Sequence, residues 1–168
     1  MKHLISILGA QLLLAIPSFA VTWDVVTISA VVKVGGGALT TTNLTARSYL
    51  NSVAVNSGTA KSDLFVGFRE DNGQVAVVRR SDETILFTIV GTPAGGGTAS
   101  NGSATKAFIS AGANVASPSN VVFAGAIYDQ VTRSEAGAIL SVSRTFSGGN
   151  GNQVIKGTIR TTGKKIEL

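Results

Sequence analysis

Short segments rich in valine and isoleucine alternate with clusters of glycine along the chain from residue 22 onward. β-branched side chains favour strands, whereas glycine loses the most backbone entropy on ordering and interrupts them. The alternation is longest in residues 22–34, which end at the glycines 35–37. One alternate set there is wholly apolar: Val26, Ile28, Ala30, Val32 and Val34. The pattern predicts an all-β fold, either an antiparallel sandwich or a short barrel of about eight strands.

Residues 64–90 predict a three-stranded antiparallel meander. Its strands are 64–69, 74–80 and 84–90, and they are separated by short polar segments. The first of these segments contains Asn72-Gly73, a favoured pair for a two-residue type I′ hairpin.

That hairpin predicts a register. It pairs Asp71 with Gln74 and places Phe68 opposite Val77 and Val66 opposite Arg79. The predicted core face is Leu64, Val66, Phe68, Val75 and Val77. The other face is mixed, so we expect it to be partly covered: Phe65, Arg69, Ala76, Val78 and Arg80.

The second half of the chain also predicts strands. Residues 91–103 form a long glycine-rich loop or linker. The expected strands lie near 121–128, 138–146 and 153–161, with turns at 117–119 and 148–151.

Two segments fit a short helix and a strand equally well, namely 44–55 and 104–115. In the first, Asn43 is the candidate N-cap and Gly58 follows the end.

The chain is predicted to hold one β domain over residues 21–168. Residues 47–52 resemble residues 106–111, which suggests a two-fold internal repeat of about 21–90 and 104–168 joined by loop 91–103. Chance similarity in a sequence of low complexity explains the likeness equally well.

Residues 1–20 resemble a secretory signal peptide. A positive start is followed by the apolar run 4–16, and small residues precede a predicted cleavage between Ala20 and Val21. A retained membrane anchor is the alternative, but the apolar run is shorter than the roughly 20 residues that span a bilayer. We expect an exported protein, in the periplasm, at the cell surface or outside the cell. The lack of cysteine favours a bacterial source.

The residue inventory excludes several kinds of chemistry. The chain has no cysteine, and its one histidine is His3, inside the predicted signal peptide. Disulfides, thiolate nucleophiles, Cys/His zinc sites and histidine-based triads are therefore ruled out for the mature chain. No catalytic residue, metal ligand or cofactor is assigned.

The net charge of +5 comes from scattered lysines and arginines. Solubility alone explains such a charge, and the alternative is an anionic partner such as a polysaccharide or a charged surface. Self-association through exposed strand edges is a further possibility. Nucleic acid is disfavoured, because no polybasic tract with interleaved aromatics occurs. Three aromatics are candidates for a stacking platform but fit the core or its rim better: Trp23, Tyr49 and Tyr128.

The sequence thus predicts a non-enzymatic structural, surface or binding protein. The alternative is a carrier of a small apolar ligand, in a cavity lined by Val66, Phe68, Val77 and Phe123. A hydrolase using two carboxylates ranks third, because the adjacent acids at 70–71 and 82–83 lie in predicted turns. An outer-membrane barrel is disfavoured by the few aromatics and the long glycine-rich gaps.

Overall fold

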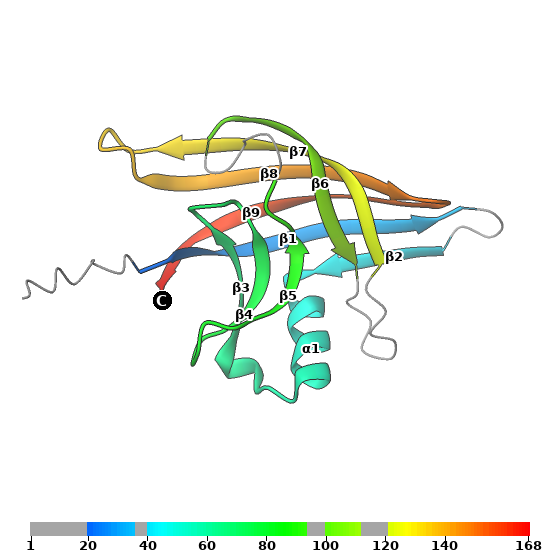
Figure 1. Cartoon of the computed structure of the whole chain (residues 1–168), viewed down its shortest axis with the longest axis horizontal. Helices are drawn as coiled ribbons and strands as arrows, with labels where there is room; N and C mark the ends of the chain where they lie inside the picture. The colour runs from blue at the N-terminus through cyan, green and yellow to red at the C-terminus, as the bar shows by residue number, and fades with distance from the viewer. Residues whose placement is uncertain (1–19, 36–39, 94–99, 112–120) are drawn as a thin grey trace, which may run out of the picture.

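The computed structural model describes residues 20–35, 40–93, 100–111 and 121–168 (Figure 1). Nine strands, one α-helix and one 3-10 turn occur in this part of the chain. In chain order they are β1 (Thr22–Val34), β2 (Thr40–Thr45), α1 (Ala46–Ser57), η1 (Lys61–Asp63), β3 (Leu64–Arg69), β4 (Val75–Arg79), β5 (Ile85–Val90), β6 (Gly102–Ala111), β7 (Val121–Arg133), β8 (Ile139–Asn150) and β9 (Gln153–Glu167).

Eight of these strands close into an antiparallel barrel. The order is β1-β3-β4-β5-β6-β7-β8-β9, and β9 returns to pair with β1 along almost its whole length. The all-β prediction is confirmed, in its barrel form. β2 lies outside the closed circuit and pairs with residues 29–34 of β1, while residues 23–25 of β1 pair with β3.

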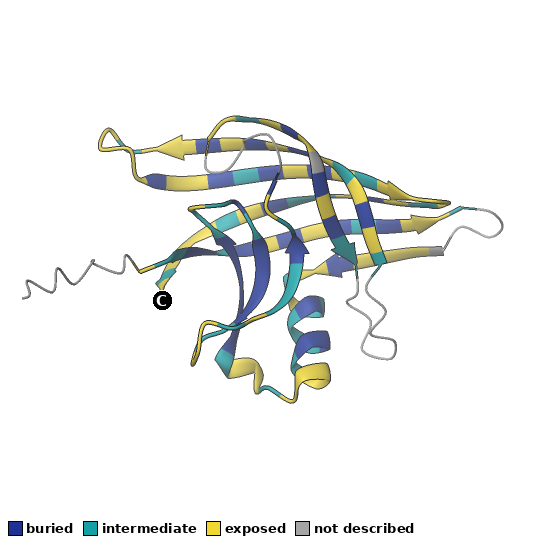
Figure 2. Cartoon of the chain, viewed as in Figure 1, coloured by how far each residue is buried: buried dark blue, intermediate teal, exposed yellow. Residues whose placement is uncertain are grey.

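The core fills the barrel from alternate positions of the strands. Figure 2 shows this alternation as buried and exposed bands along the long strands. Because side chains of a strand point to opposite faces in turn, each long strand gives one set to the interior and one to the outside. The largest fully buried apolar side chains include Tyr49, Phe68, Phe123, Ile89, Ile109, Ile127, Ile155 and Ile159.

The β3–β4 hairpin confirms the predicted core face but corrects its register. Phe68 lies opposite Val75, and Val66 lies opposite Val77. The Arg69 N–H donates to the Gln74 carbonyl oxygen at 2.8 Å, so the loop between them is residues 70–73, and the Gly73 N–H donates to the Arg69 carbonyl oxygen at 2.8 Å. The predicted two-residue type I′ turn is therefore wrong. The register differs by two residues, which leaves every side chain on its predicted face.

On the opposite face of the same strands, Phe65, Ala76 and Val78 form a second, smaller apolar cluster with Trp23 of β1. The rings of Trp23 and Phe65 meet edge to face, with 6.1 Å between centroids. The guanidinium of Arg80 lies 5.4 Å from the Phe65 ring centroid. Arg69 and Arg80 are half-buried, so this face is partly covered, as its mixed composition predicted.

β8 extends through the glycines that were expected to form a turn. Gly148 and Gly149 belong to this strand, which ends at Asn150. A Cβ on Gly125 of β7 would lie only 2.0 Å from the Ser147 carbonyl oxygen of β8. A Cβ on Gly148 would lie 3.0 Å from the Ala124 carbonyl oxygen, so Gly125 and Gly148 allow β7 and β8 to approach closely.

The segment 44–55 contains a helix, α1, although its cap is not Asn43. Thr45 is the N-cap, its hydroxyl accepts from the Ser48 N–H at 3.1 Å, and the Ser48 hydroxyl accepts from the Thr45 N–H at 2.8 Å. Gly58 ends the helix with φ 66°, a left-handed conformation that favours glycine. Of the second ambiguous segment, residues 104–111 lie in β6, and residues 112–115 fall outside the described part, as does the predicted turn at 117–119.

α1 packs its apolar side into the barrel at the end where β3 and β5 begin, which we call the helix end. Tyr49 is 1% exposed, and its hydroxyl donates to the Ser110 carbonyl oxygen of β6 at 2.8 Å. Its ring lies 5.7 Å from that of Phe87 of β5. β5 and β6 pair at one position, Val90 with Ile109, so Tyr49 bridges strands that diverge towards this end.

Candidate functional site

The largest candidate site is a groove on the outside of the barrel. It consists of two pockets, of about 610 and 450 Å³, that share Val31, Ser147 and Lys156. Most of its lining residues are the outward-facing positions of β1, β6, β7, β8 and β9. We refer to these two pockets together as the outer groove.

A row of hydroxyl groups crosses the outer groove at right angles to the strands. Register places Ser103 beside Tyr128, then Thr145, Thr158 and Ser29 on successive strands. Neighbouring strands lie about 4.8 Å apart, so the row spans five strands with roughly that spacing. Tyr128 is 46% exposed, whereas Trp23 and Tyr49 are buried. Only one member of the three-aromatic set is therefore available to a partner.

Positive charge borders the outer groove. Lys156 lines both pockets, and Lys33 lines the smaller one. Arg160, four residues after Lys156 on β9, is exposed on the same face. None of the residues lining the groove is aspartate or glutamate. The charged side chains that line the groove are therefore all cationic.

A second candidate site lies at the opposite end of the barrel from α1, where β1 begins and β3 and β9 end; we call it the charged end. Asp24 of β1 is 1% exposed, and its Oδ1 accepts from the Lys165 Nζ at 2.8 Å. Lys165 also donates to Glu70, the residue that follows β3. Burial first, and then a hydrogen bond with Asp24, raise the pKa of Glu70 above its ordinary value despite Lys165.

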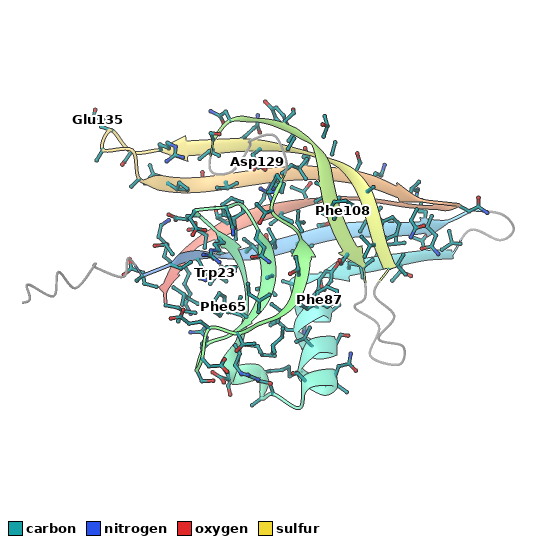
Figure 3. The ribbon with its side chains drawn as sticks, in the orientation of Figure 1. Trp23, Phe65, Phe87, Phe108, Asp129 and Glu135 are labelled. Atoms are coloured by element: carbon teal, nitrogen blue, oxygen red, sulfur yellow. The ribbon has the colours of Figure 1, made fainter. Side chains whose placement is uncertain are left out.

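A buried ion pair lies deeper in the barrel at the same end. The Arg144 guanidinium donates to both carboxylate oxygens of Asp129, at 2.7 and 2.8 Å, and both side chains are fully buried. Its third nitrogen donates to the Gly73 carbonyl oxygen at 2.6 Å, and its centre lies 5.0 Å from the Phe68 ring centroid. Figure 3 labels Asp129 among the long strands of the barrel. The pair thereby ties the β3–β4 loop to β7 and β8.

A pocket of about 370 Å³ adjoins the charged end. Glu70, Arg133 and Ile139 line it, together with residues 20–22. Arg133 donates to the Gly137 carbonyl oxygen at 2.7 Å. The pocket thus lies between the start of β1, the β3–β4 loop and the β7–β8 hairpin.

The residues predicted to line a carrier cavity come together inside the barrel. Val66, Phe68, Val77 and Phe123 are each at most 2% exposed and belong to one core cluster. None of them lines the three pockets described above. The carrier function stays a prediction.

The predicted cleavage site lies at the charged end. Ala20 is exposed, and the Val21 N–H donates to the Leu168 carbonyl oxygen at 2.8 Å. Residues 1–19 fall outside the described part, so cleavage also stays a prediction. The same holds for the domain boundaries and the internal repeat; residues 47–52 lie in α1, whereas residues 106–111 lie in β6.

Sequence reasoning missed both charged clusters, although one signal was available. Asp129 is in phase with the inward-facing Ile127 and Val131, and Arg144 is in phase with Val142 and Phe146. A charge that shares the apolar face of a strand must be paired when buried. Pairing these two by sequence alone requires the strand order, which no local pattern supplies.

In the described residues, histidines, cysteines and carboxylates nowhere gather in a group of three that could bind a metal ion. The same residues contain no helix that is both long and apolar enough to cross a membrane. Comparison with protein-family models, with curated proteins and with solved structures found no match.

Proposed function

We propose that the chain is an exported, non-enzymatic binding protein that holds an anionic polysaccharide in the outer groove. The observation that carries the proposal is the composition of the groove, in which hydroxyl groups and lysines occur without any carboxylate. A neutral sugar polymer accounts for the hydroxyls, but only an anionic one accounts for the exclusion of acids as well.

The hydroxyl row supplies polar partners at short, regular intervals. Each hydroxyl both donates and accepts, as the hydroxyls of a sugar do. The exposed Tyr128 adds a flat apolar surface with a polar tip, which suits the face of a sugar ring. A chain of sugars lying across the strands meets these groups one strand after another.

The cations supply the preference for charge. Lys156 and Arg160 lie on one face of β9 and are separated by about 13 Å along the strand. Hydrogen bonds to ionised groups are stronger than neutral ones, so carboxylates or sulfates on the polymer gain more from this face than neutral hydroxyls do.

The test compares polygalacturonate with neutral dextran by isothermal titration calorimetry on protein that starts at Val21. We expect binding to polygalacturonate and at least tenfold weaker binding to dextran. Binding should weaken as salt rises, because exposed charges are screened. Equal affinity for the two polymers, or no affinity for either, contradicts the proposal.

A matched pair of variants locates the binding site. Lys156→Glu places a negative charge in both pockets of the groove and should lower the affinity for polygalacturonate about tenfold or more. Arg47→Glu makes the same change at an exposed position of α1, away from the groove, and should alter affinity less than twofold. Similar losses in the two variants would place the binding elsewhere.

Export is tested separately, by intact mass spectrometry of the protein from the exported fraction of its own host. The expected mass corresponds to a chain that begins at Val21. A mass that retains residues 1–20 contradicts cleavage, and absence of the protein from the exported fraction contradicts export; neither result bears on the groove.

A further inference from the structure

The cluster at the charged end holds more negative than positive charge. Lys165 is the one cation bonded to both Asp24 and Glu70. Asp24 Oδ2 is buried and has no hydrogen-bond partner. A buried carboxylate oxygen without a donor costs free energy, because it has lost water and gained nothing in exchange.

The neighbouring Glu70 side chain can supply the missing donor when it is protonated. The carboxyl of Glu70 lies close to that of Asp24, because both bind the Lys165 Nζ. When ionised it can only accept a hydrogen bond, but when protonated it can donate one. Two carboxylates held this close disfavour the doubly ionised state.

We propose that Asp24 and Glu70 hold one proton in common, with Glu70 donating to Asp24 Oδ2 and Lys165 balancing the single remaining charge. The pair is thus a proton-binding site, and the bond crosses from β1 to the end of β3. β1 and β3 pair over residues 23–25, so the shared proton reinforces a short seam in the barrel wall.

The other charged groups around this site are already engaged. Asp71 receives two hydrogen bonds from Arg69, and Arg133 binds the Gly137 carbonyl oxygen. Deeper in the barrel, Arg144 and Asp129 are bonded to each other. Lys165 has its pKa raised: burial opposes its charge, but its hydrogen bonds to Asp24 and Glu70 outweigh that effect. It therefore keeps its charge while Glu70 titrates.

The sign of the pH effect follows from the raised pKa of Glu70. The folded protein binds this proton more tightly than the unfolded chain, whose glutamate titrates near 4.5. The resulting stabilisation is complete below about 4.5 and is lost as pH rises through the pKa of the folded state. The contact between β1 and the end of β3 is therefore most stable at acidic pH.

The direct test is a carboxyl NMR titration of uniformly ¹³C-labelled protein. We expect the Glu70 side chain to titrate clearly above 4.5. A Glu70 midpoint at or below 4.5 overturns the proposal. In Asp24→Asn the Glu70 midpoint should fall; an unchanged midpoint also overturns it, because Asp24 is then not the partner.

Thermal unfolding tests the consequence. Glu70→Gln replaces the protonated carboxyl with a permanent donor, so its melting temperature should match the wild type near pH 4.5 and exceed it by about 2–4 °C at pH 8. The control Asp71→Asn neutralises the adjacent acid and should leave the wild-type pH profile unchanged. A Glu70→Gln offset that is the same at every pH contradicts the proposal.

Discussion

The two ends of the barrel are closed by different kinds of interaction. At the helix end, Tyr49 and Val53 of α1 are buried against the apolar core, and one hydrogen bond from Tyr49 reaches β6. At the charged end, two ionic clusters join strands and a loop, and one of them is fully buried. The stability of an apolar contact depends on the area buried and on how well the surfaces fit. The stability of a buried ion pair depends on both partners being present, because loss of one leaves an unpaired charge. The charged end should therefore respond to pH and to single charge changes, and the helix end should respond to neither.

Removal of Arg144 should produce the largest effect. Arg144→Met leaves Asp129 as an unpaired charge in the core and frees the β3–β4 loop, and breaking such a pair costs about 3–5 kcal/mol. Urea unfolding of the variant measures this loss. A loss below 1 kcal/mol would show that the charged end does not depend on the pair.

The double variant Arg144→Met with Asp129→Leu sharpens the same test. Removing both charges removes the unpaired carboxylate, so most of the lost stability should return. If the double variant is as unstable as the single one, the stability comes from the bond to the Gly73 carbonyl oxygen and not from the ion pair.

At the helix end, Val53→Ala should cost about 2 kcal/mol, from two buried methyl groups and the space they leave. Because Val53 packs in the apolar core cluster, the loss should be equal at pH 5 and pH 8. Urea unfolding at both pH values checks this. A pH-dependent loss would break the contrast between the two ends.

Tyr49→Phe should have a smaller effect, of about 1 kcal/mol, because it removes one hydrogen bond and keeps the ring. Burial raises the pKa of Tyr49, so its hydroxyl stays protonated well into alkaline solution. Chemical denaturation at neutral pH is the measurement, and Tyr128→Phe, at an exposed tyrosine, is the control that should change little.

The smallest effect is expected for Asp71→Asn. Its pair with Arg69 is bidentate but exposed to solvent, and such pairs contribute about 0–1 kcal/mol. A loss above 2 kcal/mol in urea unfolding would mean that the exposed Arg69–Asp71 pair also stabilises this end of the barrel.

Local patterns predicted the parts of the fold that depend on local physics. The alternation in residues 22–34 became β1, and the core face of β3 and β4 was correct although the register was not. A slip of two residues preserves the face, so burial can be predicted where pairing cannot. The short strand β2 was missed, since its sequence, residues 40–45, is polar and shows no apolar alternation.

The functional surfaces depend on contacts that are distant in the sequence. Lys165 and Asp24 meet only because β9 returns to β1. The hydroxyl row combines single residues from five strands, none of which is unusual by itself. Composition therefore excluded cysteine chemistry, but it could not locate a groove that the closure of the sheet creates.

The pairing of β1 with β9 also has a consequence for how the chain is made. Thr22 pairs with Glu167, so β1 cannot complete its pairing until β9 has been synthesised. At the usual 5–20 residues per second, synthesis of the residues between them takes about 7–30 s. Until β9 arrives, β1 and β8 remain open edges, and barrels built on such distant pairs fold slowly. Any protein that binds this chain during synthesis therefore binds a sheet whose edges are still unpaired.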